Sequence, residues 1–277
     1  MSGPDARGLF VSDIDGTLVT PDKTLTPRAR EAAAALAVAG IPFTVVSSRP
    51  VRGMAQVVSE LAVTLPFAAF NGGSLAAPGG AVIAAHRLGA EAARAALDLL
   101  SRRGVDVWVF ADDQWMLRDP RGENVPLERR TVGFDPLVVT GFEAVIDRVD
   151  KLVAVSNDRL ALDGAEQALR AALAGSANIE RSQPYYVDVT HPLANKGEAV
   201  KALAARVGAD LARTVVIGDM TNDIAMFKVA GFAIAMGQAP ANVKAAAAAV
   251  TGSNLDDGFA NAVQTWVIPR LGAAEAA

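Results

Sequence analysis

The chain of 277 residues contains no cysteine. A disulfide framework, a thiolate zinc site, an iron–sulfur cluster and a cysteine nucleophile are therefore excluded. Its two histidines, His86 and His191, lie far apart in the sequence, which argues against a histidine-rich metal centre or a hydrolase triad. No apolar run approaches the ~18 residues of a spanning helix, and the N-terminus lacks the apolar stretch of a signal peptide. We therefore expect a cytoplasmic protein.

Charge of one sign does not dominate. The chain has 26 basic and 30 acidic residues, a net charge of −4 and a pI near 5.3. This balance argues against broad electrostatic binding to nucleic acid or an anionic membrane, although it leaves room for a local basic patch. Because 51% of the residues are hydrophobic, the chain can bury a core and is not disordered. The length is that of one large domain or two modest ones.

Both ends of the chain alternate short apolar strands with helices. At the start, strands are expected at 8–11, 41–46 and 67–70, with an alanine-rich helix opened by Thr26-Pro27 and closed by Gly40. From Lys196 the same rhythm returns: helices at 196–207, at 222–230 and after Pro240, and strands at 214–217 and 232–235. Strand–helix–strand order predicts a parallel sheet with right-handed crossovers.

The middle of the chain has a different texture. Strands are expected at 81–86, 105–111, 115–118 and 151–157, then near Ile179 and at 185–190, and helices near 90–103 and 162–174. Asp112-Asp113 forms a tight turn between two of these strands. The sequence therefore predicts an α/β fold, a Rossmann-like parallel-sheet core (1–80 and 190–277) with an inserted α+β cap domain (81–189).

Acidic residues follow the first predicted strand. Asp13 and Asp15 stand two apart, so in extended backbone their side chains face the same side. Two such carboxylates require a cation between them or a proton on one of them. An ordinary acidic turn is the competing interpretation. A calcium loop does not fit, because its sixth and twelfth positions are Leu18 and Thr24.

A second acidic pair follows the strand at 214–217. Asp219 ends that strand, and Asp223 lies four residues further on, where it can face the same pocket or simply cap a helix. Because the carboxyl ends of parallel strands meet at one edge of the sheet, the two pairs should converge there. Such an oxygen-rich site suits Mg²⁺.

A magnesium site of this kind usually meets phosphate. Ser47 ends the strand at 41–46 and offers a hydroxyl beside a helix start, and Lys196 precedes a helix and offers a compact positive charge. Taken alone, each has a simpler explanation, a cap and a surface lysine. Neither GxxxxGK[ST] nor GxGxxG occurs, so an ATP-hydrolysing P-loop or a Rossmann cofactor site has no support.

With these residues in place, the chain resembles the haloacid dehalogenase-like hydrolases, and among them the Cof-type phosphatases with a large inserted cap. Matching segments occur in family order over almost the whole chain: 13–18 (DIDGTL), 47–49 (SSR), 71–73 (NGG), 195–197 (NKG), 218–223 (GDMTND), 235–240 (AMGQAP), 243–244 (VK) and 256–258 (DDG). Two positions depart from the family pattern: Ser48 replaces a usual glycine, and Gln238 a usual asparagine.

The resemblance implies a role for each site residue. Asp13 is then the nucleophile that forms an aspartyl-phosphate, and Asp15 the acid and base, with a pKa near the working pH. Mg²⁺ is held by Asp13, the backbone carbonyl of Asp15 and Asp219. Asp223 either binds the metal, directly or through a bound water, or orients Lys196. The phosphate is bound by Ser47, Ser48, Lys196 and Asn222.

The resemblance therefore implies a Mg²⁺-dependent phosphatase for a small phosphorylated metabolite, a sugar phosphate being one candidate. A phosphomutase, which returns the phosphoryl group to its substrate, is the alternative enzyme; a non-catalytic phosphoacceptor domain is a different class, but such domains are shorter and lack a cap. Four residues near the return from the cap to the core either face the pocket or, more simply, pack: Tyr185, Tyr186, Asp188 and His191. The sequence does not indicate the oligomeric state.

Overall fold

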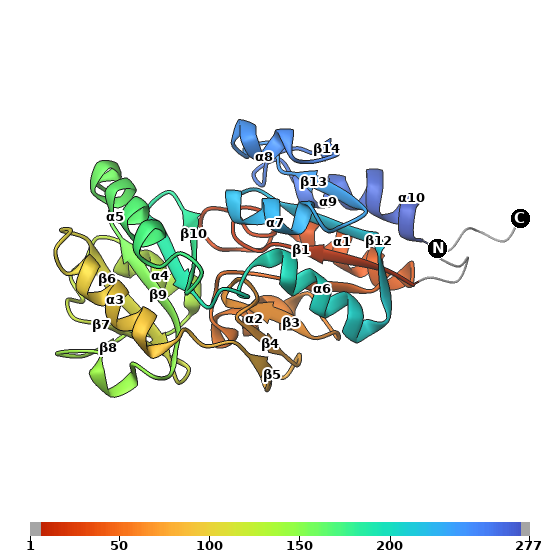
Figure 1. Cartoon of the computed structure of the whole chain (residues 1–277). Helices are drawn as coiled ribbons and strands as arrows, with labels where there is room; N and C mark the ends of the chain where they lie inside the picture. The colour runs from red at the N-terminus through yellow and green to blue at the C-terminus, as the bar shows by residue number, and fades with distance from the viewer. Residues whose placement is uncertain (1–6, 273–277) are drawn as a thin grey trace, which may run out of the picture.

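The computed structural model describes residues 7–272, which form two lobes (Figure 1). The described chain begins and ends in the first lobe, whose five-stranded sheet has the order β14–β13–β12–β1–β2 and is parallel throughout. Its strands are β1 (Arg7–Ser12), β2 (Phe43–Val45), β12 (Ala209–Gly218), β13 (Phe232–Ala235) and β14 (Ala249–Val250). The predicted α/β class and its parallel core are confirmed.

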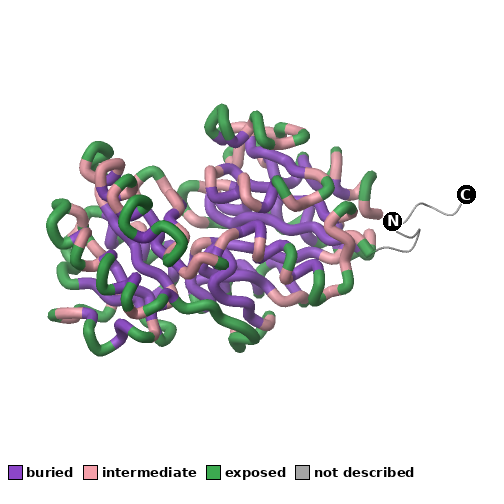
Figure 2. The backbone as a smooth tube through the Cα atoms, viewed as in Figure 1, coloured by how far each residue is buried: buried purple, intermediate pink, exposed green. Residues whose placement is uncertain are grey.

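Helices cover both faces of this sheet. Phe10 of β1 packs into one apolar cluster while its neighbours Leu9 and Val11 pack into another, as the alternation of side chains along a strand requires. The Phe10 face is covered by α1 (Pro27–Val38), α2 (Val51–Glu60) and α9 (Gly258–Ala262), which continues into a π-helical turn (Val263–Val267) and α10 (Ile268–Leu271). The other face is covered by α6 (Lys196–Val207), α7 (Ile224–Phe227) and α8 (Ala241–Ala245). The buried strands run through the middle of the lobe in Figure 2.

The predicted strand at 67–70 does not simply extend the parallel sheet. It forms β3 (Phe67–Ala69), which pairs antiparallel with β4 (Ser74–Ala76) and touches the parallel sheet through a single bridge between Val46 and Ala68. The chain turns back at Phe70 and Asn71, which both have positive φ, so the next strand returns beside the first. The strand expected at 81–86 becomes β5 (Val82–Ala85), and it pairs with β4 and not with the inserted sheet.

The second lobe holds a six-stranded sheet in the order β10–β11–β9–β6–β7–β8. Its strands are β6 (Asp106–Ala111), β7 (Gln114–Leu117), β8 (Leu137–Val138), β9 (Val149–Val155), β10 (Asn178–Gln183) and β11 (Tyr186–Thr190). One face packs on α3 (Ala90–Leu100) and α5 (Arg159–Ala172). The opposite face carries Trp108, Phe110 and Trp115, which join the same apolar cluster as the first lobe. The inserted α+β unit is confirmed, while its boundaries as a domain stay a prediction.

Two helical segments differ from expectation. The helix α4 (Val125–Val132) was not predicted, although Pro126 near its start and Gly133 in the left-handed region after its end are ordinary signals. The helix expected at 222–230 is shorter and divided into a 3₁₀ turn (Thr221–Asp223) and the four-residue α7. In both cases the helix is too short for hydrophobic periodicity to be informative.

The chain crosses between the lobes twice, after β5 and after β11. His86 lies at the first crossing and His191 at the second, and their rings stack with centroids 5.1 Å apart. The two histidines are therefore neighbours, although 105 positions separate them in the sequence. Among residues 7–272, no helix is both long enough and apolar enough to span a bilayer.

The β6–β7 turn offers a test of this arrangement. Asp112 and Asp113 have φ of 51° and 60°, which favours glycine at the second position. Replacing Asp113 by glycine, while Asp112 keeps its 2.8 Å ion pair with Arg148, should raise the free energy of unfolding by roughly 0.5–1 kcal/mol. Urea unfolding followed by circular dichroism measures the change. The same substitution at Asp98, inside α3, should destabilise by roughly 0.3 kcal/mol, because glycine has a somewhat lower helix propensity than aspartate. Equal losses at both sites would contradict the turn geometry.

Candidate active site

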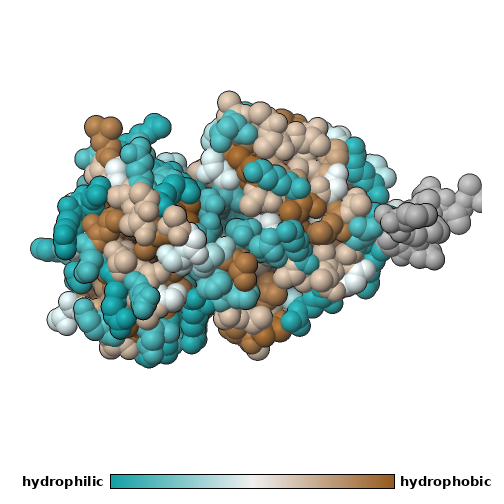
Figure 3. All heavy atoms as spheres, in the orientation of Figure 1, coloured by the Kyte–Doolittle hydropathy of each residue, from teal (hydrophilic) through white to brown (hydrophobic). Residues whose placement is uncertain are grey.

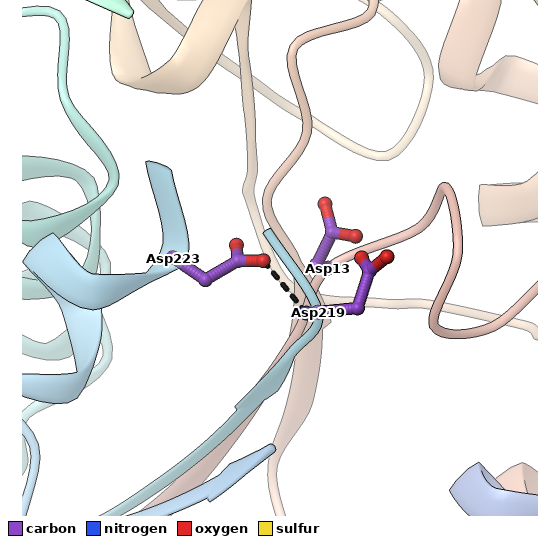
Figure 4. Close-up of side chains that lie close together, drawn as sticks. All are labelled: Asp13, Asp219 and Asp223. Atoms are coloured by element: carbon purple, nitrogen blue, oxygen red, sulfur yellow. Dashed lines mark hydrogen bonds between the residues drawn. The ribbon is translucent and has the colours of Figure 1, made fainter. Parts of the chain in front are cut away.

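The ends of β1 and β12 bring the first two acidic residues together. These strands are neighbours, with Ser12 opposite Ile217, and the backbone N–H of Asp13 donates to the carbonyl of Ile217 at 3.0 Å. Asp13 and Asp219 thus leave the sheet at the same edge, and their carboxylates extend to the same side (Figure 4). One carboxylate oxygen from each of Asp13, Asp219 and Asp223 lies within 4.8 Å of the others. Of the two predicted acidic pairs, Asp219 and Asp223 converge with Asp13, whereas the side chain of Asp15 does not join them.

Lys196 connects two of these acids. It is the first residue of α6, capped by the side chain of Asn195, and its Nζ lies 2.6 Å from Asp13 Oδ1 and 2.6 Å from Asp223 Oδ1. The other oxygen of Asp223 accepts 2.8 Å hydrogen bonds from the backbone N–H groups of Asp219 and Met220. Both oxygens of Asp223 are therefore engaged within the protein. Of the two roles left open for Asp223, this geometry favours orienting Lys196.

The cluster carries more negative charge than its lysine balances. All four side chains are buried, and burial raises the pKa of Asp13 to about 7, with Lys196 opposing the shift and Asp223 adding to it. The pKa of Asp219 is raised by burial and by Asp13. Burial lowers the pKa of Lys196, but the ion pairs with Asp13 and Asp223 outweigh it, so that pKa is raised. Three carboxylates around one ammonium leave a deficit of two positive charges, which one divalent cation would supply.

Donor chemistry agrees with this charge count. Asp13 and Asp219 present carboxylate oxygens, and hard cations such as Mg²⁺ prefer oxygen ligands. The Thr17 hydroxyl lies 3.4 Å from Asp219 Oδ1 and holds that carboxylate at the edge of the sheet. The site is thus a candidate divalent-metal site in which Asp13 and Asp219 are the available carboxylate ligands.

The Asp15 carboxylate is bound by two basic side chains and does not join the cluster of the other three acids. Arg49 donates to both of its oxygens, at 2.7 and 2.8 Å, and Lys23 Nζ lies 2.8 Å from Oδ1. Burial raises the pKa of Asp15, but Arg49 and then Lys23 outweigh that effect and hold it well below its usual range. The expectation that Asp15 has a pKa near the working pH is therefore not met in this arrangement. Its side chain also lies outside the Asp13–Asp219–Asp223 group, which leaves only its carbonyl as a predicted ligand.

The predicted phosphate-binding residues occupy different positions. Ser47 is buried, and its hydroxyl accepts a 3.1 Å hydrogen bond from the N–H of Arg49. Ser48 is partly exposed, and its carbonyl accepts from Lys151 of the second lobe at 2.8 Å. Asn222 donates to Asn71 at 3.1 Å, whereas its own Oδ1 is buried without a partner. The phosphate roles of these residues stay predictions.

The second lobe adds Lys151 and Glu128, which sequence reasoning missed, beside Asp188, which it named as a candidate. Lys151 lies in β9; its Nζ is 3.7 Å from a carboxylate oxygen of Asp188 and 4.9 Å from the ring centroid of Phe110. Asp188 accepts from Asn71 at 3.3 Å, so this carboxylate links the two lobes. Glu128, on α4, is also buried. The charged pair Asp150-Lys151 interrupts the apolar run of β9, and this interruption is the signal that could have identified Lys151.

The two tyrosines near the return to the first lobe face the candidate site, whereas the second histidine does not. Tyr185 and Tyr186 line a small cavity of about 20 Å³ together with Asp15 and Arg49, so they face the candidate site. Tyr186 packs as well, with its ring 5.2 Å from that of Trp108. His191 stacks on His86 at the crossing and contributes to neither cavity nor acid cluster.

Comparison with known proteins identifies the family to which the chain belongs. The family model described as haloacid dehalogenase-like hydrolase matches residues 10–263, so the chain belongs to the haloacid dehalogenase-like hydrolases. The resemblance noted from the sequence motifs is confirmed.

Relatives of similar length extend the comparison. A pyridoxal phosphate phosphatase of Escherichia coli is 26% identical over 266 residues, which cover 92% of this chain and 97% of that protein. A 5-amino-6-(5-phospho-D-ribitylamino)uracil phosphatase of Bacillus subtilis is 26% identical over 276 residues, covering 90% and 94%. The crystal structure of a haloacid dehalogenase-like hydrolase from Bacteroides thetaiotaomicron superposes with a TM-score of 0.81 at 25% identity, covering 93% and 98%.

The raised pKa of Asp13 predicts how the stability of the metal-free protein depends on pH. Between its ordinary value near 4 and about 7, the folded state binds a proton that the unfolded state does not, so the free energy of unfolding should fall as the pH rises through this window. Replacing Asp13 by asparagine removes this contribution. The variant should therefore gain at least about 1 kcal/mol relative to wild type between pH 5 and pH 8, measured by urea unfolding in chelator. A constant difference across that range would contradict the assignment.

Proposed function

We propose that the chain is a Mg²⁺-dependent phosphatase that hydrolyses a small phosphorylated metabolite through an aspartyl-phosphate on Asp13. The observation that carries the proposal is the buried cluster of Asp13, Asp219, Asp223 and Lys196 at the carboxyl edge of the parallel sheet. Family membership and the phosphatase relatives support the reaction class, and the names of two relatives, which act on phosphorylated heterocyclic metabolites, support a small substrate.

Asp13 is the group placed to attack phosphorus. Its carboxylate is fixed by Lys196 on one side and lies beside Asp219 on the other. Bound Mg²⁺, held by Asp13, Asp219 and the carbonyl of Asp15, would offset the repulsion between the anionic nucleophile and the anionic ester. An oxygen of Asp13 forms a bond to phosphorus as the bond to the ester oxygen breaks. Water then attacks the phosphorus of the aspartyl-phosphate, releasing phosphate and restoring the carboxylate.

Asp15 supplies the proton for the leaving oxygen in this scheme. With Arg49 and Lys23 on its two oxygens, the carboxyl is ionised and cannot donate. An anionic substrate that competes for these two cations weakens their hold on Asp15 and raises its pKa. Substrate binding thus allows Asp15 to carry the proton that it donates to the leaving oxygen. The Asp15 carboxylate left after this transfer takes a proton from the hydrolytic water in the second step.

Lys196, Ser47 and Asn222 hold the transferred phosphoryl group. Lys196 brings a buried positive charge. The Nδ2 of Asn222 donates to Asn71, and because an amide NH2 has two donors, its second N–H can bind a phosphoryl oxygen. Asp223 acts through Lys196, since it contacts the ammonium and two backbone N–H groups. Positioning and charge neutralisation are most of what phosphoryl transfer requires of a protein.

The nucleophile assignment predicts a specific loss. Asp13→Asn should lower kcat for p-nitrophenyl phosphate by at least about 10³-fold, because an amide does not form the phosphoryl ester. Circular dichroism checks that the variant is folded, and Asp98→Asn, an exposed change on α3, serves as the matched control. Turnover at the wild-type rate in an Asp13→Asn preparation free of host phosphatase would refute the role of Asp13.

The metal assignment is tested separately. After exhaustive treatment with chelator, hydrolysis should fall at least about 100-fold and return on addition of Mg²⁺, because the charge deficit of the acid cluster is again unbalanced. Free phosphate should accumulate in step with alcohol, which distinguishes a phosphatase from a phosphomutase. Full activity in excess chelator would remove the metal from the mechanism.

A further inference from the structure

A basic cavity lies next to the candidate active site. It has a volume of about 300 Å³ and is bounded by the turn around Lys23, by α2 of the first lobe and by the end of α4 of the second. Both lobes therefore contribute to its wall. Five basic side chains line it: Lys23, Arg30, Arg49, Arg52 and Arg130. Among the described residues of the lining, Glu60 is the single acid. Such a concentration of positive charge is notable in a chain whose net charge is −4.

Two of these arginines are not neutralised. Lys23 and Arg49 are paired with Asp15, and Arg30 with Glu60 at 2.6 Å. Within residues 7–272, no carboxylate lies within 4.0 Å of the guanidinium of Arg52 or Arg130. Arg52 is held over the ring of Phe134 at 4.4 Å. Unpaired guanidinium groups in a concave site favour an oxyanion ligand.

The basic cavity is where the part of the substrate that is released from the phosphate can lie. The small cavity against Asp15 has a volume of about 20 Å³, which is room for about one water molecule and not for the rest of a substrate. The two cavities share Lys23, Arg49 and Thr131 in their walls. In the reaction proposed above, the ester oxygen lies at Asp15, so the rest of the substrate has to extend from that point. Lys23 and Arg49, the basic partners of Asp15, also line the basic cavity, so the substrate can extend into it.

We propose that this cavity binds the distal end of the substrate, and that this end carries a second oxyanion, such as a phosphate, held by Arg52 and Arg130. The inference rests on the phosphatase function proposed above and narrows its substrate class to metabolites that are anionic at both ends. Because Arg52 belongs to the first lobe and Arg130 to the second, such a ligand also joins the lobes around the reacting ester.

Symmetric substrates test the proposal. The Mg²⁺-loaded protein is assayed with α,ω-alkanediol bisphosphates of three to six carbons and with the matching alkyl monophosphates. At the best length, kcat/KM should be at least about tenfold higher for the bisphosphate, well above the factor of about 2 that two equivalent phosphates give by statistics. In Arg52→Gln/Arg130→Gln the ratio should fall towards that factor, chiefly through KM. Arg94→Gln/Arg102→Gln, which removes two exposed charges elsewhere in the second lobe, should keep the wild-type ratio.

The outcomes separate this inference from the function on which it rests. Hydrolysis of the monophosphates with a statistical ratio in wild type overturns the inference and leaves the phosphatase intact. If no ester is hydrolysed, the proposed function fails, and calorimetric binding of the same pairs to Asp13→Asn still measures the ratio. Inhibition by sulfate that depends on Arg52 and Arg130, with no preference for bisphosphates, would assign the cavity to a free anion and overturn the substrate assignment. Thermal midpoints confirm that each double variant is folded.

The cavity lies at the seam between the lobes. Figure 3 shows hydrophilic side chains gathered along this seam on the face in view, consistent with a polar boundary around the buried aromatic contact between the lobes. The described contact between α2 and α4 is close: a Cβ on Gly53 would lie 3.1 Å from the Cα of Val132. The second lobe thus reaches the first directly beside Arg52, which places the two unpaired arginines on a shared wall.

Discussion

The structure depends on three buried carboxylates sharing one buried ammonium. Lys196 can satisfy one oxygen of Asp13 and one of Asp223, but it leaves Asp219 and the remaining charge unbalanced. In a low-dielectric interior such an excess is expensive unless protons or a cation compensate it. Burial and the neighbouring carboxylates raise the pKa values of Asp13 and Asp219, so protonation is one of these two ways to reduce the excess charge. The same imbalance would favour a divalent ion at this candidate metal site.

Glycine makes this concentration of charge sterically possible. Gly16 has φ of +85°, and a Cβ there would collide with the Asp219 carboxylate; a Cβ on Gly218 would collide with that of Asp223. Both glycines stand directly beside an acid in the sequence, after Asp15 and before Asp219. In each acid–glycine pair the acid supplies negative charge, and the glycine, which has no side chain, leaves space for a second carboxylate. This close approach explains why the motif contains glycine and not another small residue at these positions.

The sequence predicted the parallel core and the edge on which the acids meet, because strand ends and residue order determine both. Helix 196–207 and strand 232–235 were predicted with the bounds observed. The ionic state of Asp15 could not be predicted, since Arg49 is 34 positions away and Lys23 lies in a turn without periodicity. The role of Lys151 depends on how one lobe faces the other, with a hydrogen bond to Ser48 across 103 positions. Pairings set by lobe contact carry no local sequence signal.

The two lobes divide the work that the site requires. The first supplies the charge cluster, and the second supplies Lys151, Asp188, Tyr185 and Tyr186, which surround Asp15 and Asn71. The contact is held by apolar packing of Phe70 against Phe110, with centroids 6.0 Å apart, and by the polar links around it. In the proposed function, selectivity and catalysis would meet at this seam, and the second lobe would help to exclude water from the reacting groups.

The central claim is that the charge deficit at Asp13 and Asp219 is met by a divalent cation. Crystals of the protein soaked in Mn²⁺, which scatters anomalously and resembles Mg²⁺ in its preference for oxygen ligands, test it directly. The account predicts an anomalous peak coordinated by carboxylate oxygens of both Asp13 and Asp219, with Asp223 still bound to Lys196. Full occupancy of Mn²⁺ elsewhere, with no peak between these two carboxylates, would contradict it.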